Sequence, residues 1–209
     1  MRKKITLWVC TLCMLGLSGA LQAQNRFLPE RSQLDEVNKA VKASRDSWLN
    51  MFPANELPDY GFRDQREKSS SVPGKPIEVF AMYRDSDGKI KSQPTGEFLV
   101  PLLIDGKSRT FLTVAYFENK WQVVAVGEMN LAQEAAPFIS RAGKEGSDNL
   151  IWLKNINHAA DFIASAGTAL SDDQLQFMPL STAQRASFKE PLSYRQLEAR
   201  VNKMLVQFD

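Results

Sequence analysis

Few residue types in this chain could carry out catalysis. His158 is the only histidine, and the two cysteines, Cys10 and Cys13, both lie within an apolar run near the N-terminus. A zinc site needs several convergent ligands, and the common serine hydrolases use a Gly-x-Ser-x-Gly turn, which the sequence lacks. We therefore expect no catalytic residue, no metal ion and no cofactor, and we interpret His158 as a packed or capping residue.

Two lysine-containing motifs match fragments of known catalytic signatures. Gly106-Lys107-Ser108 matches the end of a phosphate-binding loop, and Ser86-Asp87-Gly88-Lys89 has the Ser-x-x-Lys spacing of penicillin-recognising enzymes. Both chemistries need these residues at the start of a helix. Here each motif stands between segments with the pattern of β-strands, so we interpret both as turns with solvated lysines.

Carboxylates could hydrolyse a glycosidic bond without histidine or cysteine. Glu97, Glu118, Glu128 and Asp161 are candidates because each flanks an expected strand or helix. Nothing in their spacing pairs two of them, so a carboxylate-based hydrolase is the least favoured of the functions considered.

The N-terminal residues have the pattern of a secretory signal peptide. Arg2, Lys3 and Lys4 precede an apolar run over 5–17, and small residues follow up to Ala23. This order of charge, apolar run and cleavage site predicts a signal peptide over 1–23, with Ala20 as the alternative cleavage site. The cysteines lie inside the apolar run and not after it, so we expect an exported, periplasmic or extracellular protein that is not lipid-anchored.

Removing that segment changes the charge of the protein. The full chain has 26 basic and 24 acidic residues; without the three basic residues of the leader, the net charge is −1. No basic run is left for a nucleic-acid partner, and no second apolar stretch is long enough for a membrane span. The length fits one domain over 24–209, with 157–209 as a possible C-terminal sub-lobe.

The order of patterns predicts an α+β fold: an N-terminal helix packed on an antiparallel β-meander, followed by a helix-rich C-terminal segment. Helical periodicity covers 32–51, and a polar surface connection over 64–76 leads to a strand over 77–83. The meander consists of 98–104, 110–117 and 121–126, with turns at Asp105-Gly106 and Glu118-Asn119-Lys120;. Further helices are expected over 130–141, 181–188 and 193–208, and further strands over 150–153 and 175–180, while 159–170 fits helix or loop.

The first meander strand is apolar on both faces. Phe98, Val100 and Leu102 alternate with Leu99 and Leu103. Such a strand needs both faces covered, one by a helix and the other by further chain or a partner. Pro101 lies within it and cannot donate a backbone hydrogen bond, so we expect this strand at an edge of the sheet or bulged.

Aromatic residues provide the candidate binding positions. Several stand at expected strand ends and turns, where an amphipathic ring can serve a binding surface, although core packing explains the same pattern. The candidates for contact with a ligand or partner are Tyr60, Phe62, Tyr83, Trp121 and Trp152.

The layout between residues 60 and 127 also resembles a class of exported bacterial α+β domains of uncharacterised function. The shared elements are Tyr60-Gly61-Phe62, Gly74-Lys75-Pro76, the Asp105-Gly106-Lys107 hairpin, and Trp121 before a Val-Gly strand end. The helix-then-meander order is similar to cystatin-like and PepSY-like folds. The resemblance covers about a third of the chain and concerns structural residues, so it implies a fold and transfers no catalytic residue.

These observations favour an exported, non-enzymatic module that binds a protein or peptide partner, in an inhibitor-like or chaperone-like role. Docking would use an exposed sheet edge or a groove between helix and sheet. The alternative is a small-ligand carrier, which would require an apolar pocket of several hundred cubic ångströms, roughly.

Overall fold

The computed structural model describes residues 27, 30–145, 149–166 and 174–206. The predicted signal peptide over 1–23, with both cysteines, lies outside the described residues. So does the end of the ambiguous segment 159–170.

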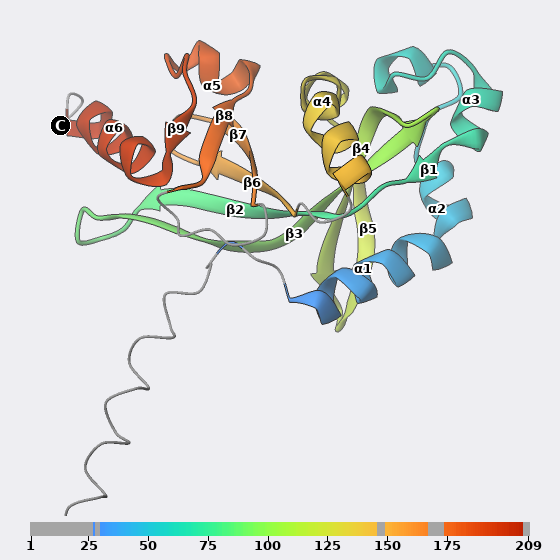
Figure 1. Ribbon diagram of the computed structural model, residues 1–209. Helices are drawn as coiled ribbons and strands as arrows, with labels where there is room; N and C mark the ends of the chain where they lie inside the picture. The colour runs from blue at the N-terminus through green and yellow to red at the C-terminus, as the bar shows by residue number, and fades with distance from the viewer. Residues whose placement is uncertain (1–26, 28–29, 146–148, 167–173, 207–209) are drawn as a thin grey trace, which may run out of the picture.

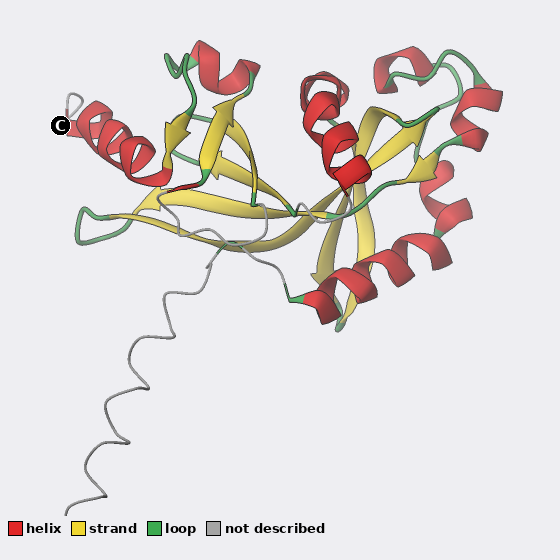
Figure 2. Cartoon of the chain, viewed as in Figure 1, coloured by secondary structure: helices red, strands yellow, loops and turns green. Residues whose placement is uncertain are grey.

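The described residues form one nine-stranded sheet, with helices on both of its faces (Figures 1 and 2). The strand order is β5-β4-β3-β2-β6-β7-β8-β9. The short strand β1 is not part of this order and pairs with β3. The strands are β1 (Val72–Pro73), β2 (Ile77–Arg84), β3 (Ile90–Ile104), β4 (Lys107–Phe117), β5 (Lys120–Gly127), β6 (Leu150–Asn155), β7 (Ala160–Ser165), β8 (Gln176–Pro179) and β9 (Leu192–Ser193). The helices are α1 (Arg31–Ala43), α2 (Arg45–Leu49), the 3-10 helix η1 (Leu57–Tyr60), α3 (Gln65–Ser70), α4 (Met129–Glu145), α5 (Ser181–Arg185) and α6 (Tyr194–Val206).

The antiparallel meander and the α+β class predicted from the sequence are confirmed. Strands β2, β3, β4 and β5 pair consecutively and antiparallel. One part of the meander is longer than predicted, because β3 begins at Ile90 and not at residue 98. The side chains of its first half are mostly exposed, which removes the apolar alternation that identifies a strand;.

The predicted layout of the C-terminal part needs correction. This part is not simply helix-rich, because β6 joins β2 in parallel and β7 and β8 extend the sheet antiparallel. A core cluster beneath α5 and α6 contains Phe162, Phe177 and Tyr194 together with Phe80 and Met82 of β2. The described residues of 157–209 therefore share their core with β2 of the meander.

Both faces of β3 are covered, as its apolar pattern predicted. Phe98, Val100 and Leu102 belong to a core cluster with residues of α1 and α2. Leu99, on the opposite face, packs in a cluster with Leu131 and other residues of α4. Figure 1 shows α4 and α1 on opposite sides of the meander strands.

Pro101 does not mark an edge strand, because β3 lies between β4 and β2. The pairing of β2 with β3 reaches only Leu99, and β1 takes over at Leu102, so Pro101 lies where the neighbouring strand changes. Its carbonyl accepts a hydrogen bond from the Gly74 N–H (2.7 Å). The register between β3 and β4 shifts between Leu102 and Leu103, where Arg109 of β4 is the extra residue, so the bulge lies in the neighbouring strand and not in the strand of Pro101;.

The N-terminal helix predicted over 32–51 is two helices. Ser44 separates α1 from α2, and its hydroxyl donates to the Ala40 carbonyl (2.8 Å), a local bond that competes with helical pairing;.

The helix α4 continues past Pro137, whose side chain is exposed.

The connection predicted over 64–76 contains a helix, α3, and the strand β1. The Asp64 carboxylate caps α3 by accepting from the Glu67 N–H (2.8 Å);. The buried Glu67 carboxylate in turn accepts from the Arg63 N–H (2.6 Å) and the Arg109 guanidinium (3.3 Å). These bonds fasten α3 to β4 without an apolar face, which is why hydrophobic periodicity did not predict it.

Among the described residues, no helix combines the length and the apolar character needed to cross a membrane.

Candidate functional site

The β4–β5 hairpin forms one edge of the sheet. Glu118 and Asn119 have positive φ angles of 51° and 60°, which a two-residue hairpin turn requires;. β5 is first in the strand order, so on one side it pairs with no strand among the described residues. A register shift between Thr113 and Val114 leaves Val124 without a cross-strand partner and divides the edge into two short regular stretches. Such a bulge restricts unselective pairing at an edge.

Large hydrophobic side chains are exposed on this hairpin. Tyr116 is 55% exposed, Phe117 is 58% exposed and Val124 is 44% exposed. These are three of the six exposed large hydrophobic residues in the described part of the chain; the others are Met51, Val72 and Ile156. We call Tyr116, Phe117, Trp121 and Val124 the hairpin surface. Several large exposed hydrophobic residues on one hairpin indicate a candidate interaction site.

Trp121 connects the hairpin surface to α1. Its ring packs edge-to-face on Phe98 (5.3 Å between centroids) and on Tyr116 (5.4 Å). Its indole Nε1–H donates to the Glu36 carboxylate (3.0 Å). A groove of about 370 Å³ lies beside it, and we call this the hairpin groove; it is lined by Glu36, Lys39, Ala40, Ala43, Tyr116, Asn119, Lys120 and Trp121.

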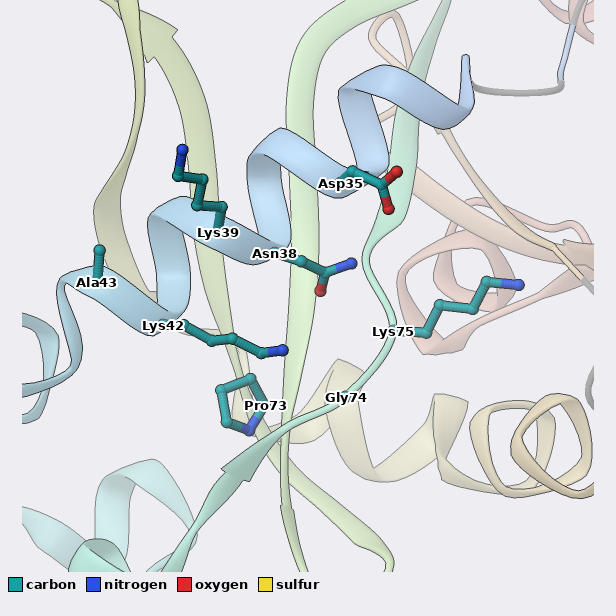
Figure 3. Close-up of a pocket in the computed structure, with 8 residues that line it drawn as sticks. All are labelled: Asp35, Asn38, Lys39, Lys42, Ala43, Pro73, Gly74 and Lys75. Carbon is teal, nitrogen blue, oxygen red and sulfur yellow. The ribbon is translucent and has the colours of Figure 1, made fainter.

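A larger groove of about 930 Å³ lies on the other side of α1 (Figure 3). We call it the basic groove; it is lined by Asp35, Asn38, Lys39, Lys42, Ala43, Pro73, Gly74 and Lys75. Gly74 is required at its wall, because an added Cβ would lie 2.9 Å from a Pro101 ring carbon. The Gly-Lys-Pro motif thus has a packing role, and it brings the β1–β2 connection to the side of α1.

The other four predicted binding residues lie elsewhere. Trp152 and Phe62 are 0% and 1% exposed and belong to the core, so they have no surface to offer a partner. Tyr60 is half-buried against Phe52, where the two rings meet edge-to-face. Tyr83 is at the end of β2, and its hydroxyl donates to the Gln93 side chain (3.0 Å). The structure therefore does not bring the five predicted aromatics together, and only Trp121 belongs to the hairpin surface.

The four candidate carboxylates lie on different parts of the sheet. Glu118 and Glu128 flank opposite ends of β5, about 25 Å apart for a strand of eight residues;. Asp161 is buried and accepts from the Trp152 indole (2.9 Å) and the Thr182 hydroxyl (2.9 Å). Glu97 lies on β3 opposite Ala115. The two hydrogen bonds that Asp161 accepts indicate a structural role for this carboxylate.

The described residues include no group of three or more histidine, cysteine, aspartate or glutamate side chains arranged to hold a metal ion. His158 lies in the β6–β7 turn, where its ring packs on Phe188 (6.2 Å). This placement fits the packed histidine expected from the sequence.

The small-ligand alternative needs an apolar chamber. An apolar cavity between α4 and the sheet, lined by Ile77, Leu103, Ile139 and Leu150 among others, has a volume of about 80 Å³. Even benzene occupies an engineered cavity of about 150 Å³, so this cavity is too small for a lipid or aromatic ligand.

One buried carboxyl has a perturbed pKa. Glu78 of β2 lies opposite Phe98 of β3 and Ile151 of β6, and paired residues share a face of the sheet;. Burial between these apolar neighbours and, as the smaller cause, the negative charge of Glu30 together raise the pKa of Glu78 to about 7;.

Sequence reasoning did not select Tyr116, Phe117 or Val124 as site residues. The available signal was two consecutive aromatic residues directly before a turn. Neighbours on a strand point to opposite faces, so Tyr116 and Phe117 place aromatic surface on both faces of the hairpin end.

Comparison of the chain with protein-family models, curated proteins and solved structures gave no match.

Proposed function

We propose that this protein is an exported binding module that docks a segment of a protein or peptide partner on the hairpin surface. The observation that carries this proposal is that three of the six exposed large hydrophobic residues of the described part, Tyr116, Phe117 and Val124, lie on the two strands of the edge hairpin. On the side of β5 that pairs with no described strand, the backbone has donors and acceptors for a partner strand, and the exposed side chains offer apolar contact. Strand addition combines these two kinds of contact. Export rests on the N-terminal sequence pattern alone.

The edge suits a short segment. Lys120 to Val123 pair regularly with β4, and regular pairing resumes at Ala125 after the bulge. A partner strand would therefore meet only a few consecutive backbone groups on each side of Val124. Affinity would then depend on the aromatic side chains at the hairpin end, because such residues provide most of the energy in small interfaces.

Site-specific photocrosslinking in the native host tests this proposal. A photoreactive phenylalanine analogue at Val124 is expected to crosslink one dominant partner, whereas the same analogue at Ile156, which is 59% exposed on the β6–β7 turn, is not. The double substitution Phe117→Ser and Val124→Thr should weaken partner binding at least tenfold, about 1.4 kcal/mol. Because these side chains are exposed, thermal stability should change little.

The matched control is Ile156→Ser, which removes an equally exposed hydrophobic residue outside the hairpin surface. Equal crosslinking from both positions, or full binding by the Phe117→Ser/Val124→Thr variant, would show that the hairpin surface is not the docking site.

A further inference from the structure

Lysines surround the hairpin surface where it meets α1. Lys39 and Lys120 line the hairpin groove, and Lys39 and Lys42 line the basic groove, so the two grooves meet across α1. All three lysines are exposed, and none has an ion-pair partner within the described part of the chain. Of the carboxylates in these grooves, Glu36 already accepts the Trp121 indole hydrogen bond. Lysines outnumber carboxylates in the lining of the two grooves, so the junction has a net positive charge.

The positions of these side chains extend that charge around α1. Figure 3 shows Lys42 and Asn38 extending toward Pro73 and Gly74, while Lys39 extends to the other side of the helix. The hairpin turn adds Lys120 at the first residue of β5. A segment that leaves the edge of β5 at its Lys120 end would pass Lys120 and Lys39 before it reached Lys42.

The opposite end of β5 has the opposite charge. The exposed Glu128 follows Gly127 directly, so the edge is basic at its first residue and acidic just beyond its last. Such an arrangement distinguishes the two orientations of a charged partner segment, because electrostatic complementarity fixes register and suppresses wrong pairings.

We infer that the partner segment is an acidic peptide whose carboxylates lie against Lys120, Lys39 and Lys42 while its neighbouring residues pair with β5. This inference rests on the proposed function and specifies the chemistry of the partner. A peptide is favoured over nucleic acid because Asp35 and Glu36 lie among the lysines, whereas a phosphate backbone needs continuous positive charge;. Each exposed ion pair contributes little to the binding free energy, so the lysines affect the specificity for an acidic partner more than the affinity.

Selection from a random twelve-residue peptide library displayed on phage tests this inference on residues 24–209. Peptides that bind the wild-type protein are expected to be rich in Asp and Glu at one end. A synthetic peptide of the selected sequence should bind the Lys39→Glu/Lys120→Glu variant about fivefold more weakly, and raising the salt concentration should reduce this difference. The Lys89→Glu/Lys189→Glu variant changes the charge equally, at exposed lysines outside the two grooves, and should bind as wild type does.

The outcomes separate the two proposals. Selected peptides that need Phe117 and Val124 but have no acidic bias would overturn the inference and leave the proposed function standing. Peptides that bind the Phe117→Ser/Val124→Thr variant as well as wild type would overturn both. Competition by a twelve-nucleotide single strand, equal to that of the acidic peptide, would overturn the inference in favour of a general polyanion surface.

Discussion

Replacing Asp161 with alanine should lower the free energy of unfolding by about 3 kcal/mol at pH 7. Asp161 accepts two side-chain hydrogen bonds, from the Trp152 indole and the Thr182 hydroxyl, and it is only 8% exposed. Its own N–H donates to the Thr182 hydroxyl oxygen (2.8 Å). Alanine would leave the buried indole N–H without an acceptor, and this desolvation penalty adds to the lost bonds. Urea unfolding followed by circular dichroism measures the change.

The matched control is Asp161→Asn, which keeps one oxygen as acceptor for Trp152. It should cost about 1 kcal/mol, because the amide also presents an N–H₂ group where the carboxylate accepted from Thr182. A catalytic carboxylate would behave differently, since removing a residue kept for activity commonly leaves stability unchanged or raises it. An Asp161→Ala variant as stable as wild type would therefore contradict the structural role and restore Asp161 as a hydrolase candidate.

The meander could be predicted from the sequence because its turns and its apolar residues indicate the same structure. All four turn residues of Asp105-Gly106 and Glu118-Asn119 have positive φ angles. Asp, Gly and Asn favour such angles, whereas Glu118 does not. The first half of β3 could not be predicted in this way. Lys91, Gln93 and Thr95 are exposed there, and hydrophobic periodicity does not detect a strand whose side chains contact solvent;.

The helix α3 shows that a local signal was present and outweighed by composition. Asp64 and Glu67 have the spacing of a capping box, and the Asp64 side chain does cap the helix;. Three serines and a Pro-Gly pair in the same stretch favoured a loop. The residues that α3 buries are Glu67 and Lys68, and each has a partner that is distant in sequence: the Arg109 side chain for Glu67 and the Leu49 carbonyl for Lys68.

The parallel pairing of β6 with β2 had no local signal. The chain between these strands passes through β3, β4, β5 and α4, so sequence proximity gave no indication of the partner. The same long-range pairing decides which aromatic residues are buried. Trp152 of β6 is enclosed because β2 and β7 flank its strand and α4 covers its face, whereas Trp121 of β5 has a neighbouring strand on one side only. Strand order, which the sequence pattern does not specify, therefore determines which of the predicted binding residues can reach a partner.

Glu78→Gln should make the protein more stable than wild type at pH 8, by about 2 kcal/mol. The pKa of Glu78 is about 7 in the folded protein, against an ordinary value of 4.5. Below pH 4.5 the carboxyl is protonated in both the folded and unfolded states, so it adds no pH dependence. Between pH 4.5 and 7 the unfolded chain loses this proton first, so the free energy of unfolding falls as pH rises. Above pH 7 both states are ionised and the penalty is constant.

Glutamine keeps the size of the side chain and cannot ionise, so the variant should lack this decline. The expected gain is smaller than the full conversion of the pKa shift, because the remaining solvent contact of the carboxyl screens its charge. Glu30→Gln is the matched control: it removes the smaller cause of the shift, and it should raise stability at pH 8 by less. Urea unfolding at pH 4.5, 6 and 8 gives the three stabilities for each protein. Parallel pH profiles for wild type and Glu78→Gln would show that Glu78 is solvated in the folded state, and that its place between Phe98 and Ile151 does not raise its pKa.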